Sequence, residues 1–234
     1  MQDKIAIILP VRDFGLGRSK RLVRCLKTYY EMTEGLSDIH ILHDTDECDI
    51  YHKIVDEYPG IYNYCIPPGI TLMEKINFNS LDIAKAYKYI GFIGDDIVFK
   101  TSFEKTFIDY LSSVEHGMTF GSDMYQNRAT HPFMTSKTIL AVGFYGLPAV
   151  EHNYFDDYWS YIFNELGTAK YFDSVVMEHM HPATGKEMPD EVSNRIYRNL
   201  SLDRKRFGEY MSENLYIDID RIVNYKENVS HEQN

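Results

Sequence analysis

The segment IAIILPVR, residues 5–12, decides the fold class of this 234-residue chain. Its five consecutive apolar residues, Ile5 to Leu9, are typical of a strand that is buried on both faces of a parallel sheet. The run is too short to cross a bilayer, which takes roughly 20 apolar residues. It also lacks the basic leader and the small-residue cleavage site of a secretory signal peptide. We therefore expect a buried strand with Pro10 and Arg12 at its carboxyl end.

Short apolar runs and amphipathic segments alternate outward from this strand. Further strands are expected at residues 39–42, 62–66 and 89–93, with helices at 20–32, 50–58, 72–88 and 102–116. This β-α-β-α order predicts an α/β fold with a mostly parallel central sheet flanked by helices. The second half is less regular, with strands expected at 118–121 and 175–179, and helices at 156–166 and after residue 189.

The composition is typical of a globular protein with one large core, since 44% of the residues are hydrophobic and 25% are charged. The 35 acidic and 24 basic residues give a net charge of -11, which excludes a generally basic nucleic-acid binder but allows a local basic groove. The three cysteines, Cys25, Cys48 and Cys65, have no CxxC spacing. We therefore expect neither a disulfide framework nor a thiolate zinc site, and a cytoplasmic location.

Charged residues follow three of the expected strands, where an open parallel sheet binds its ligands. Arg12 follows the first strand, Asp44 and Asp46 the second, and Asp95 and Asp96 the fourth. Two adjacent carboxylates after a buried strand raise each other's pKa or recruit a cation, and magnesium or manganese is the natural choice. The alternative is ordinary turn chemistry, because Asp is a common turn residue.

A second cluster, Glu178-His179-Met180-His181-Pro182, follows an apolar run. Strand alternation puts His179 and His181 on the same side. Together with the carboxylate pair, one or two imidazoles suit a manganese-type site, whereas zinc would want more nitrogen or sulfur ligands. The alternative is that one histidine packs in the core and the other is exposed.

A third cluster, residues 152–159, begins with His152 and contains the only tryptophan, Trp159. Asp156 and Asp157 stand at the expected start of a helix, where acidic residues are also favoured by the helix dipole. The functional interpretation is a general base beside aromatic surfaces that could stack on a sugar.

Basic residues gather around the flexible turn Gly15-Leu16-Gly17. They are Arg12, Arg18, Lys20, Arg21, Arg24 and Lys27. Guanidinium groups match phosphate oxygens, although a solvated helix face explains Lys20, Arg24 and Lys27 equally well. The sequence has no dinucleotide fingerprint, no P-loop and no Gly-x-Ser-x-Gly elbow. These absences argue against a Rossmann dehydrogenase, a P-loop NTPase and an α/β-hydrolase, respectively.

Taken in order, these residues resemble a GT-A-type glycosyltransferase, and more narrowly the small glycosyltransferase-like proteins of bacteriophages. The resemblance runs from about Ile5 to Tyr197. It is carried by Leu9 to Arg12, Arg18 to Leu22, Asp44-Thr45-Asp46, Lys75-Ile76-Asn77, residues 90–96 with Thr101, Gly121-Ser122-Asp123, residues 152–159 and 178–182, Gly185-Lys186 and Asp190.

The resemblance implies a metal-dependent transfer of a sugar from a nucleoside diphosphate donor, UDP foremost, to an acceptor hydroxyl, with Mn or Mg as cofactor. The acceptor would be a hydroxymethylated pyrimidine in phage DNA or a saccharide. It also implies a single GT-A-like catalytic domain, residues 1–205, with a Rossmann-like nucleotide-sugar half at 1–100 and an acceptor half at 101–205. A helical or extended appendage, residues 206–234, would follow.

The resemblance also implies roles for individual residues. Nucleotide-sugar binding would fall to Pro10, Arg12, Arg18, Asp44, Asp46, Lys75, Asn77 and Asp95. The metal would be held by Asp96, with Asp95 beside it, and by one of His179 and His181, with His179 favoured. Asp156 would be the base of an inverting transfer and Asp157 the substitute, whereas in a retaining transfer Asp156 would only orient the acceptor.

Two other classes of function use similar residues. A nucleotidyltransferase would share the metal, but its glycine-rich loop with a following lysine is not evident near residue 10. A non-enzymatic nucleotide- or glycan-binding module would not need the full set of carboxylates and histidines. If DNA is the acceptor, residues 18–27 and 204–206 supply cations for its phosphates, and the target base would have to leave its stack.

Overall fold

The structure is a computed structural model that describes residues 1–126 and 128–226. Its strands are β1 (Gln2–Pro10), β2 (Ser37–Asp44), β3 (Tyr62–Ile66), β4 (Tyr87–Phe92), β5 (Ile97–Phe99), β6 (Met118–Ser122), β7 (Phe133–Thr135) and β8 (Ala169–His179). Its helices are α1 (Ser19–Met32), α2 (Cys48–Val55), α3 (Leu72–Asn77), α4 (Ser80–Ala86), α5 (Glu104–Leu111), α6 (Ser136–Val142), α7 (Phe155–Glu165) and α8 (Glu191–Val223). Two short 3-10 turns, η1 (Thr45–Glu47) and η2 (Pro182–Thr184), complete the described elements.

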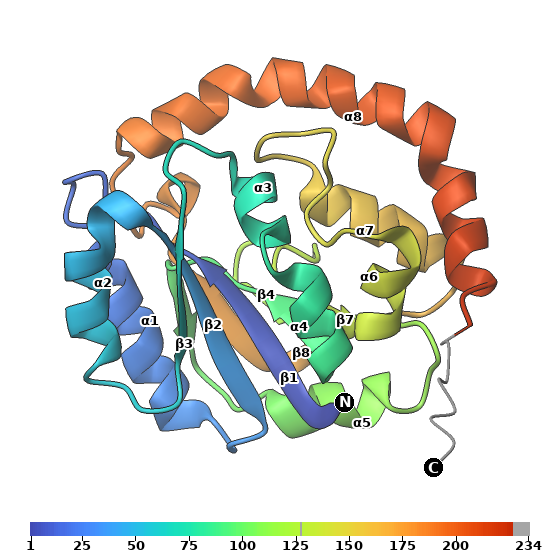
Figure 1. The fold of residues 1–234 in the computed structure, drawn as a ribbon, viewed down its shortest axis with the longest axis horizontal. Coiled ribbons are helices and arrows are strands. Elements are labelled where there is room, and N and C mark those ends of the chain that lie inside the picture. Colours follow the sequence, from blue (N-terminus) through green and yellow to red (C-terminus); the bar gives the residue numbers. More distant parts are fainter. Residues whose placement is uncertain (127, 227–234) are drawn as a thin grey trace, which may run out of the picture.

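The strands form one mixed sheet in the order β3-β2-β1-β4-β7-β6-β8-β5 (Figure 1). The β3-β2-β1-β4 half is parallel throughout, as the order of elements predicts. Beyond β4 the sheet becomes mixed, because β7 runs antiparallel to β4 and β6, and β5 runs antiparallel to β8. The expected α/β class is therefore confirmed, whereas β5 and β7 are strands that the sequence pattern does not predict.

Strand β1 is buried on both faces, which explains its continuous apolar run. Ile5, Ile7 and Leu9 belong to one core cluster together with residues of α1, α2 and α5. Ala6 and Ile8 belong to the other cluster, which residues of α3, α4, α6, α7 and α8 complete. All five side chains have no exposed surface, so the hydrophobic effect fixes this strand at the centre of two layers of helices.

Gly91 joins the parallel and the antiparallel halves of the sheet. It lies opposite Phe133 in the β4–β7 pair. A Cβ atom added at Gly91 would overlap the ring of Phe133. The glycine is therefore required by close approach, which is a common reason for glycine inside a strand.

The single helix expected at residues 72–88 is wrong. The structure has two short helices, α3 and α4, and the last residues of the range begin β4. Asn77 at the break donates its side-chain amide to the Gly146 carbonyl (2.6 Å) and accepts the backbone N–H groups of Tyr145 (2.9 Å) and Gly146 (2.8 Å). These three tertiary hydrogen bonds outweigh the helical periodicity of the sequence.

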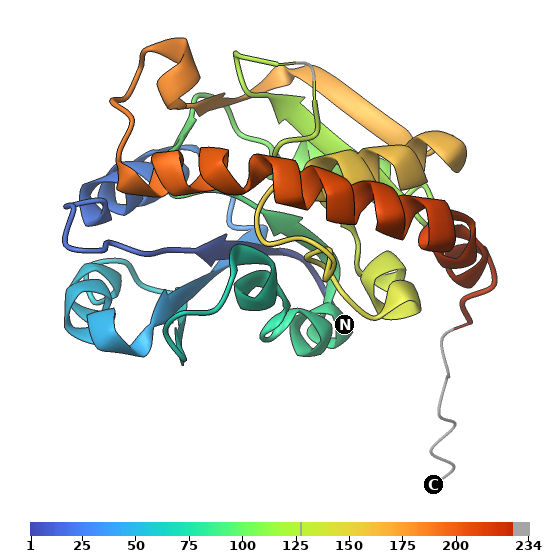
Figure 2. The same cartoon turned by 90° about the horizontal axis from the view of Figure 1, so that it is seen from above.

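Helix α8 is a 33-residue segment that spans the molecule (Figures 1 and 2). The expected boundary between residues 205 and 206 falls inside it, so residues 206–223 continue the same helix. Tyr158 of α7 donates a hydrogen bond to the buried Asp218 carboxylate (3.0 Å), which ties the second half of α8 to α7, and Tyr210 within α8 donates to the same oxygen (2.8 Å). The last eight residues of the expected appendage, 227–234, lie outside the described residues. No described helix is both long enough and apolar enough to span a membrane.

His40 on β2 packs against β3 at the edge of the sheet, and its burial makes the stability of the fold depend on pH. Its ring stacks on Tyr62 (4.6 Å between centroids), and its Nδ1 lies 3.1 Å from the Tyr64 hydroxyl. Burial lowers the pKa of His40 to about 4. Since the unfolded chain takes up this proton near pH 6.5, the free energy of unfolding falls as the pH drops from 6.5 to about 4.

We expect His40→Phe to remove this contribution, of up to about 3 kcal/mol, because phenylalanine keeps the stacked ring and cannot be protonated. Urea unfolding of both chains at several pH values between 7.5 and 4 measures the difference. If the free energy of unfolding depends on pH equally in the two chains, His40 does not have a lowered pKa in the folded state.

Candidate active site

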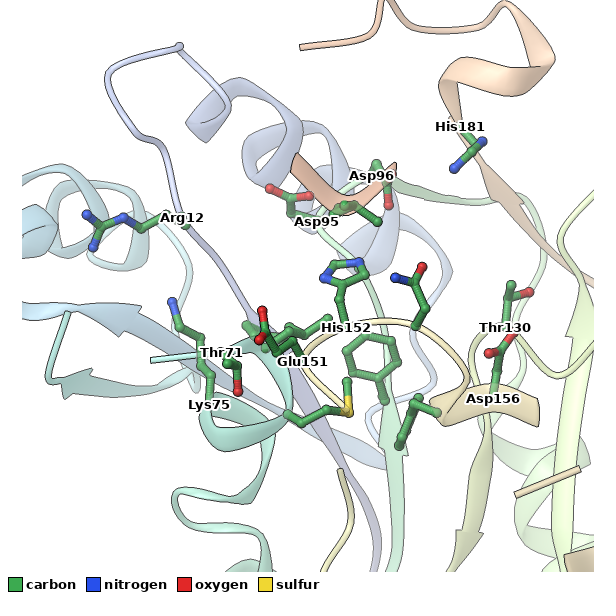
Figure 3. Close-up of a pocket in the computed structure, with 18 of the residues that line it drawn as sticks. Arg12, Thr71, Lys75, Asp95, Asp96, Thr130, Glu151, His152, Asp156 and His181 are labelled. Carbon is green, nitrogen blue, oxygen red and sulfur yellow. The ribbon is translucent and has the colours of Figure 1, made fainter. Parts of the chain in front are cut away.

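A cleft of about 600 Å3 lies beyond the carboxyl ends of β1, β2 and β4 (Figure 3). Its volume suits a small-molecule ligand, and its position is where open α/β sheets bind ligands. Of the thirteen residues expected to be catalytic, to bind the nucleotide sugar or to hold the metal, eleven line it: Pro10, Arg12, Arg18, Asp44, Lys75, Asp95, Asp96, Asp156, Asp157, His179 and His181. Asp46 and Asn77 are not among its lining residues. Asn77 instead holds the loop at residues 145–146, as described above.

One end of the cleft carries a fixed arrangement of opposite charges. Lys75 forms an ion pair with Asp44 and donates a hydrogen bond to the Val11 carbonyl (3.1 Å). Arg12 forms an ion pair with the other oxygen of Asp44 and binds Asp46 through two hydrogen bonds (2.7 and 2.9 Å). Burial lowers the pKa of Lys75, and the hydrogen bond to Asp44 opposes that effect. The end of β2 and the last turn of α3 are therefore held together by this ion pair.

The loop between β1 and α1 is shaped by two buried acids that the sequence reasoning missed. The Asp13 carboxylate accepts the backbone N–H groups of Gly17 (3.1 Å) and Ser19 (2.7 Å). Glu47 accepts those of Asp13 (2.9 Å) and Phe14 (2.7 Å). Asp13 had a usable signal, because an aspartate before a glycine turn and a helix start is a typical hydrogen-bond acceptor for free N–H groups.

The arginines of α1 are held by acids rather than left open. Arg21 pairs with Glu187 (2.7 Å) and Arg24 with the same carboxylate, while Arg18 pairs with Asp190 (3.0 Å). These contacts fix the segment between β8 and α8 against α1. Lys20 and Lys27 are exposed, as a solvated helix face predicts. Arg18 also lies 3.7 Å from an oxygen of Asp95 inside the cleft.

Asp96 and His179 meet because β5 pairs with β8. Ile97 lies opposite His179 in this antiparallel pair, and the Met180 N–H donates to the Asp96 carbonyl (3.0 Å). His179 Nε2 consequently lies 3.2 Å from Asp96 Oδ2. The sequence pattern places these residues near one another only through the fold, since 83 positions separate them.

His131 is a third donor that sequence reasoning missed. It lies just before β7, is almost fully buried, and its ring centroid is 5.0 Å from that of His179. One ligand atom each of Asp96, His131 and His179 lie within 4.8 Å of one another. A Cβ at Gly94 would lie 2.6 Å from Asp96 Oδ1 and 3.6 Å from His131 Nε2, so this glycine leaves the space between them free. No local spacing or motif marks His131 in the sequence.

The two carboxylates have opposite electrostatic environments. Burial, and then the charge of Asp96, raise the pKa of Asp95 to about 7, which Arg18 opposes. Burial also acts to raise the pKa of Asp96, but the hydrogen bond from His179 prevails and lowers it. Burial lowers the pKa of His131 to about 3, with a contribution from His179. Asp96 is therefore the ionised member of the pair, and His131 is a neutral imidazole.

The donor set Asp96, His131 and His179 fits a divalent cation. In an octahedral magnesium-type site adjacent ligands are roughly 3 Å apart, close to the 3.2 Å between Asp96 and His179. His179 Nδ1 has no hydrogen-bond partner among the described residues. Of the other expected ligands, Asp95 faces Arg18, and His181 Nδ1 accepts the Ala183 N–H (3.1 Å) at the start of η2.

The other end of the cleft contains the acids at the start of α7 (Figure 3). Arg128 lies 3.2 Å from Asp156 Oδ2 and 2.6 Å from Asp157 Oδ2. Burial, and then the charge of Asp157, raise the pKa of Asp156, which Arg128 opposes. Sequence reasoning missed Arg128. In Figure 3 Arg12 and Lys75 lie on one side of the cleft and Asp156 on the other, with Asp95, Asp96 and His152 between them.

Helix α8 positions the segment that leads into α7. The buried Asp203 carboxylate accepts the backbone N–H groups of Glu151 (2.9 Å), His152 (3.1 Å) and Asn153 (2.9 Å). Burial acts to raise the pKa of Asp203, but these hydrogen bonds prevail and lower it. Glu151 also accepts hydrogen bonds from Asn199 (3.0 Å) and Arg206 (3.1 Å). Arg206, expected to contact phosphates, therefore holds a loop of the cleft.

The fold is similar to solved glycosyltransferase structures of the GT-A type. A fragment of S. aureus TarS in complex with UDP matches with a TM-score of 0.57 and 10% identity, over 74% of this chain and 59% of that one. The mannosyltransferase PcManGT from Pyrobaculum calidifontis, in complex with GDP-Man and Mn2+, matches with 0.54 and 8%, over 94% and 73%. The catalytic domain of Drosophila beta1,4-galactosyltransferase 7, in complex with xylobiose, matches with 0.52 and 12%, over 80% and 74%.

These identities are low, so the likeness concerns the fold: the chain has a GT-A-like α/β fold. It spans 59% of the TarS fragment. No protein-family model matches the sequence, and a search of curated proteins finds no significant match.

Asp96→Asn tests the donor set directly. We expect the Kd for Mn2+, measured by calorimetry, to rise at least about tenfold, because a charged ligand becomes neutral. His131→Ala should have a comparable effect. Asp82→Asn, at an exposed carboxylate on α4, is the matched control and should bind Mn2+ as the parent chain does. An unchanged Kd in Asp96→Asn would show that the cation binds elsewhere.

Proposed function

We propose that this chain is a metal-dependent glycosyltransferase that moves a sugar from a nucleoside diphosphate donor to an acceptor hydroxyl. One observation carries the proposal. A single cleft holds the charged Arg12–Asp44–Lys75 group at one end and the half-buried Asp156 at the other. Asp96 lies between the two ends (Figure 3), and it forms a donor set with His131 and His179, which also line the cleft. The GT-A-like fold, and the UDP and GDP-Man complexes of the similar structures, support it.

The nucleotide would bind at the end formed by β1, β2 and α3. Arg12 and Lys75 supply cations, and Asp44 supplies an acceptor for hydroxyl groups of the ribose or N–H groups of the base. The Arg18 guanidinium lies 3.7 Å from an oxygen of Asp95 in the cleft. At this position it would add positive charge close to the diphosphate. Pro10 closes the floor of this subsite.

The departing diphosphate develops negative charge, which has to be neutralised at the middle of the cleft. A divalent cation held by Asp96, His131 and His179 would supply neutralisation of that charge. Arg18 lines the cleft 3.7 Å from an oxygen of Asp95 and would add positive charge there, whereas Arg21 is paired with Glu187. The bond between the anomeric carbon and the diphosphate oxygen breaks, and the electron pair leaves with the diphosphate.

The acceptor would be activated at the other end. Its oxygen forms the new bond to the anomeric carbon, and its proton passes to the Asp156 carboxylate. Burial raises the pKa of Asp156 and so makes this carboxylate a stronger base than an exposed aspartate. Arg128 orients it through their 3.2 Å contact. Asp157 shares Arg128 and would support Asp156 rather than replace it.

A saccharide is the acceptor that the surroundings favour. Tyr125 and Tyr154 line the cleft and supply aromatic rings of the kind on which sugars stack; one face of each ring already contacts a neighbour, His181 and Phe207 respectively. A hydroxymethylated pyrimidine in DNA is the second candidate acceptor. The arginines of α1 and Arg206 are paired with carboxylates, which lowers the number of cations available for DNA phosphates.

Nucleotide binding is the first test. With Mn2+ present, we expect one of UDP, GDP and CDP to raise the Tm, by an amount equivalent to about 2.7 kcal/mol at 100 times its Kd. Arg12→Gln should abolish the shift, while Lys20→Gln, on the exposed face of α1, should preserve it. The absence of a response to all three nucleotides would remove both the glycosyltransferase and a nucleotidyltransferase. A nucleotide response without any product on incubation would favour a binding module.

Asp156→Asn tests the base. The chain is incubated with a mixture of nucleotide sugars and with either oligosaccharides or hydroxymethylcytosine duplexes, and product mass identifies the reaction. We expect kcat to fall by about 10²–10⁴-fold in Asp156→Asn and by much less in Asp157→Asn. A near-normal kcat in Asp156→Asn would show that it does not act as the base.

The pH dependence gives an independent measure of the same role. A base must be deprotonated, so kcat/KM of the parent chain should fall as the pH drops through the raised pKa of Asp156. Asp156→Asn should lose this acidic limb while Asp157→Asn keeps it. An acidic limb that persists in Asp156→Asn would assign it to another group.

A further inference from the structure

A second set of metal-ligating side chains lies outside the cleft, at the β3 edge of the sheet. His43, Cys48, His52 and Cys65 each offer one ligand atom, and the four atoms lie within 4.8 Å of one another. We call this set the Cys2His2 cluster. None of its members lines the candidate active site. His43 is buried, Cys48 is half-buried, and His52 and Cys65 are exposed, so the cluster is accessible to an ion from solvent.

Three elements assemble the Cys2His2 cluster. His43 on β2 and Cys65 on β3 are direct neighbours across the parallel strand pair, so their side chains lie on the same face of the sheet. Cys48 and His52 are four positions apart in α2, which puts both on one side of that helix. Helix α2 follows β2 after only the η1 turn, and this short connection holds the helical pair over the strand pair.

The distances within the cluster are close to those around a tetrahedral zinc ion. Cys65 Sγ lies 3.6 Å from His43 Nε2 and 3.6 Å from His52 Nε2. Zinc bonds of about 2.3 Å to sulfur and 2.0 Å to nitrogen imply ligand separations of roughly 3.6 Å between S and N, and of roughly 3.8 Å between two S atoms. The Cys48 and Cys65 sulfur atoms are 2.8 Å apart, so they would separate by about 1 Å to take up the ion.

His43 is already oriented as a metal ligand. Its Nδ1 lies 3.2 Å from the Asp44 carbonyl, to which it donates when the proton is on Nδ1. Its ring also stacks on Tyr51 (5.2 Å between centroids), which fixes the ring plane. That arrangement leaves the lone pair of Nε2 directed at Cys65. A histidine whose second nitrogen donates to a backbone carbonyl is the usual supporting arrangement around protein-bound zinc.

We propose that His43, Cys48, His52 and Cys65 bind a structural Zn2+ ion that fastens α2 and the edge strand β3 to β2. Four protein ligands of two thiolates and two imidazoles fill a tetrahedral shell, which is the pattern of structural rather than catalytic zinc. Three of the four ligands come from α2 and β3, which carry few other buried residues: Tyr51 and Ile66 are their fully buried apolar side chains. An ion here would supply the cohesion that the thin packing of this edge lacks.

The expectation against a thiolate zinc site rests on the absence of CxxC spacing. Such spacing marks sites built within one local loop. Here the ligands come from two strands and a helix, and the span from residue 43 to residue 65 contains no CxxC at all. Only the strand register and the helical face bring the four residues together.

Cobalt is the probe that isolates this cluster. Co2+ added to the reduced, metal-free chain should give a thiolate-to-cobalt charge-transfer band and the intense visible bands of a tetrahedral site, at one equivalent per chain. Zn2+ should then displace the cobalt and erase the bands. Asp96→Asn should leave the bands unchanged, because the donors of the active-site cleft include no thiolate. The absence of a thiolate band in the reduced chain would overturn the proposal.

Substitutions at the exposed ligands complete the test without disturbing the core. Cys65→Ser and His52→Ala should each raise the Kd for Co2+ by at least about 100-fold, more than the loss of a supporting hydrogen bond. Lys53→Ala, at the exposed neighbour of His52, and Cys25→Ala, at the remaining thiol, should keep the parent Kd. Unchanged binding in Cys65→Ser would overturn the proposal.

Stability and the redox state of the thiols give the final readouts. In Asp96→Asn, which lacks the charged ligand of the cleft site, Zn2+ should raise the Tm and a chelator should reverse the rise, whereas the double variant Asp96→Asn/Cys65→Ser should show neither effect. When an alkylating reagent is present at cell lysis, all three cysteines should react with it, which would show that none is in a disulfide. A Cys48–Cys65 disulfide found under those conditions would replace the zinc site by a redox cross-link.

Discussion

The folded chain has to bury carboxylates, and the way in which each is compensated determines much of the structure. A buried ionised carboxylate is costly unless it is paired or hydrogen-bonded. Asp44 is paired with Lys75 and Arg12, and Asp96 with His179. Asp203 is surrounded by backbone N–H groups. Every one of these contacts joins segments that are more than thirty residues apart in sequence, so the compensation of charge also holds the walls of the cleft together.

The net charge of -11 therefore says little about the local charge around the cleft and α1. The arginines of α1 are dense in sequence, but they are engaged with Glu187 and Asp190 on the segment before α8. This network holds the segment before α8 against α1. What looked like a basic patch for phosphate is mainly a structural contact, and Arg18 is the member that also reaches an acid of the cleft.

The sequence predicts the parallel half of the fold and the edge at which a site forms. The apolar run of β1 and the acids after β2 and β4 are local signals, and parallel topology brings strand ends together. His131, Arg128 and Asp203 carry no local signal, because their roles arise from contacts with distant segments. Asn77 shows the opposite case: it lies two positions after Lys75 in the sequence, and the structure uses its side-chain amide to hold the loop at residues 145–146.

Helix α8 has a mechanical consequence. Along its axis, at 1.5 Å per residue, its 33 residues run for roughly 50 Å, and the helix curves around the molecule (Figure 1). One stretch of the helix carries Asn199, Leu200 and Asp203 at the cleft, and another carries Asp218 against α7. The cleft wall and the core beneath α7 are therefore joined by one continuous backbone. Moving this wall away from the cleft would require breaking the hydrogen bonds of Asp203 to residues 151–153 or the helix itself.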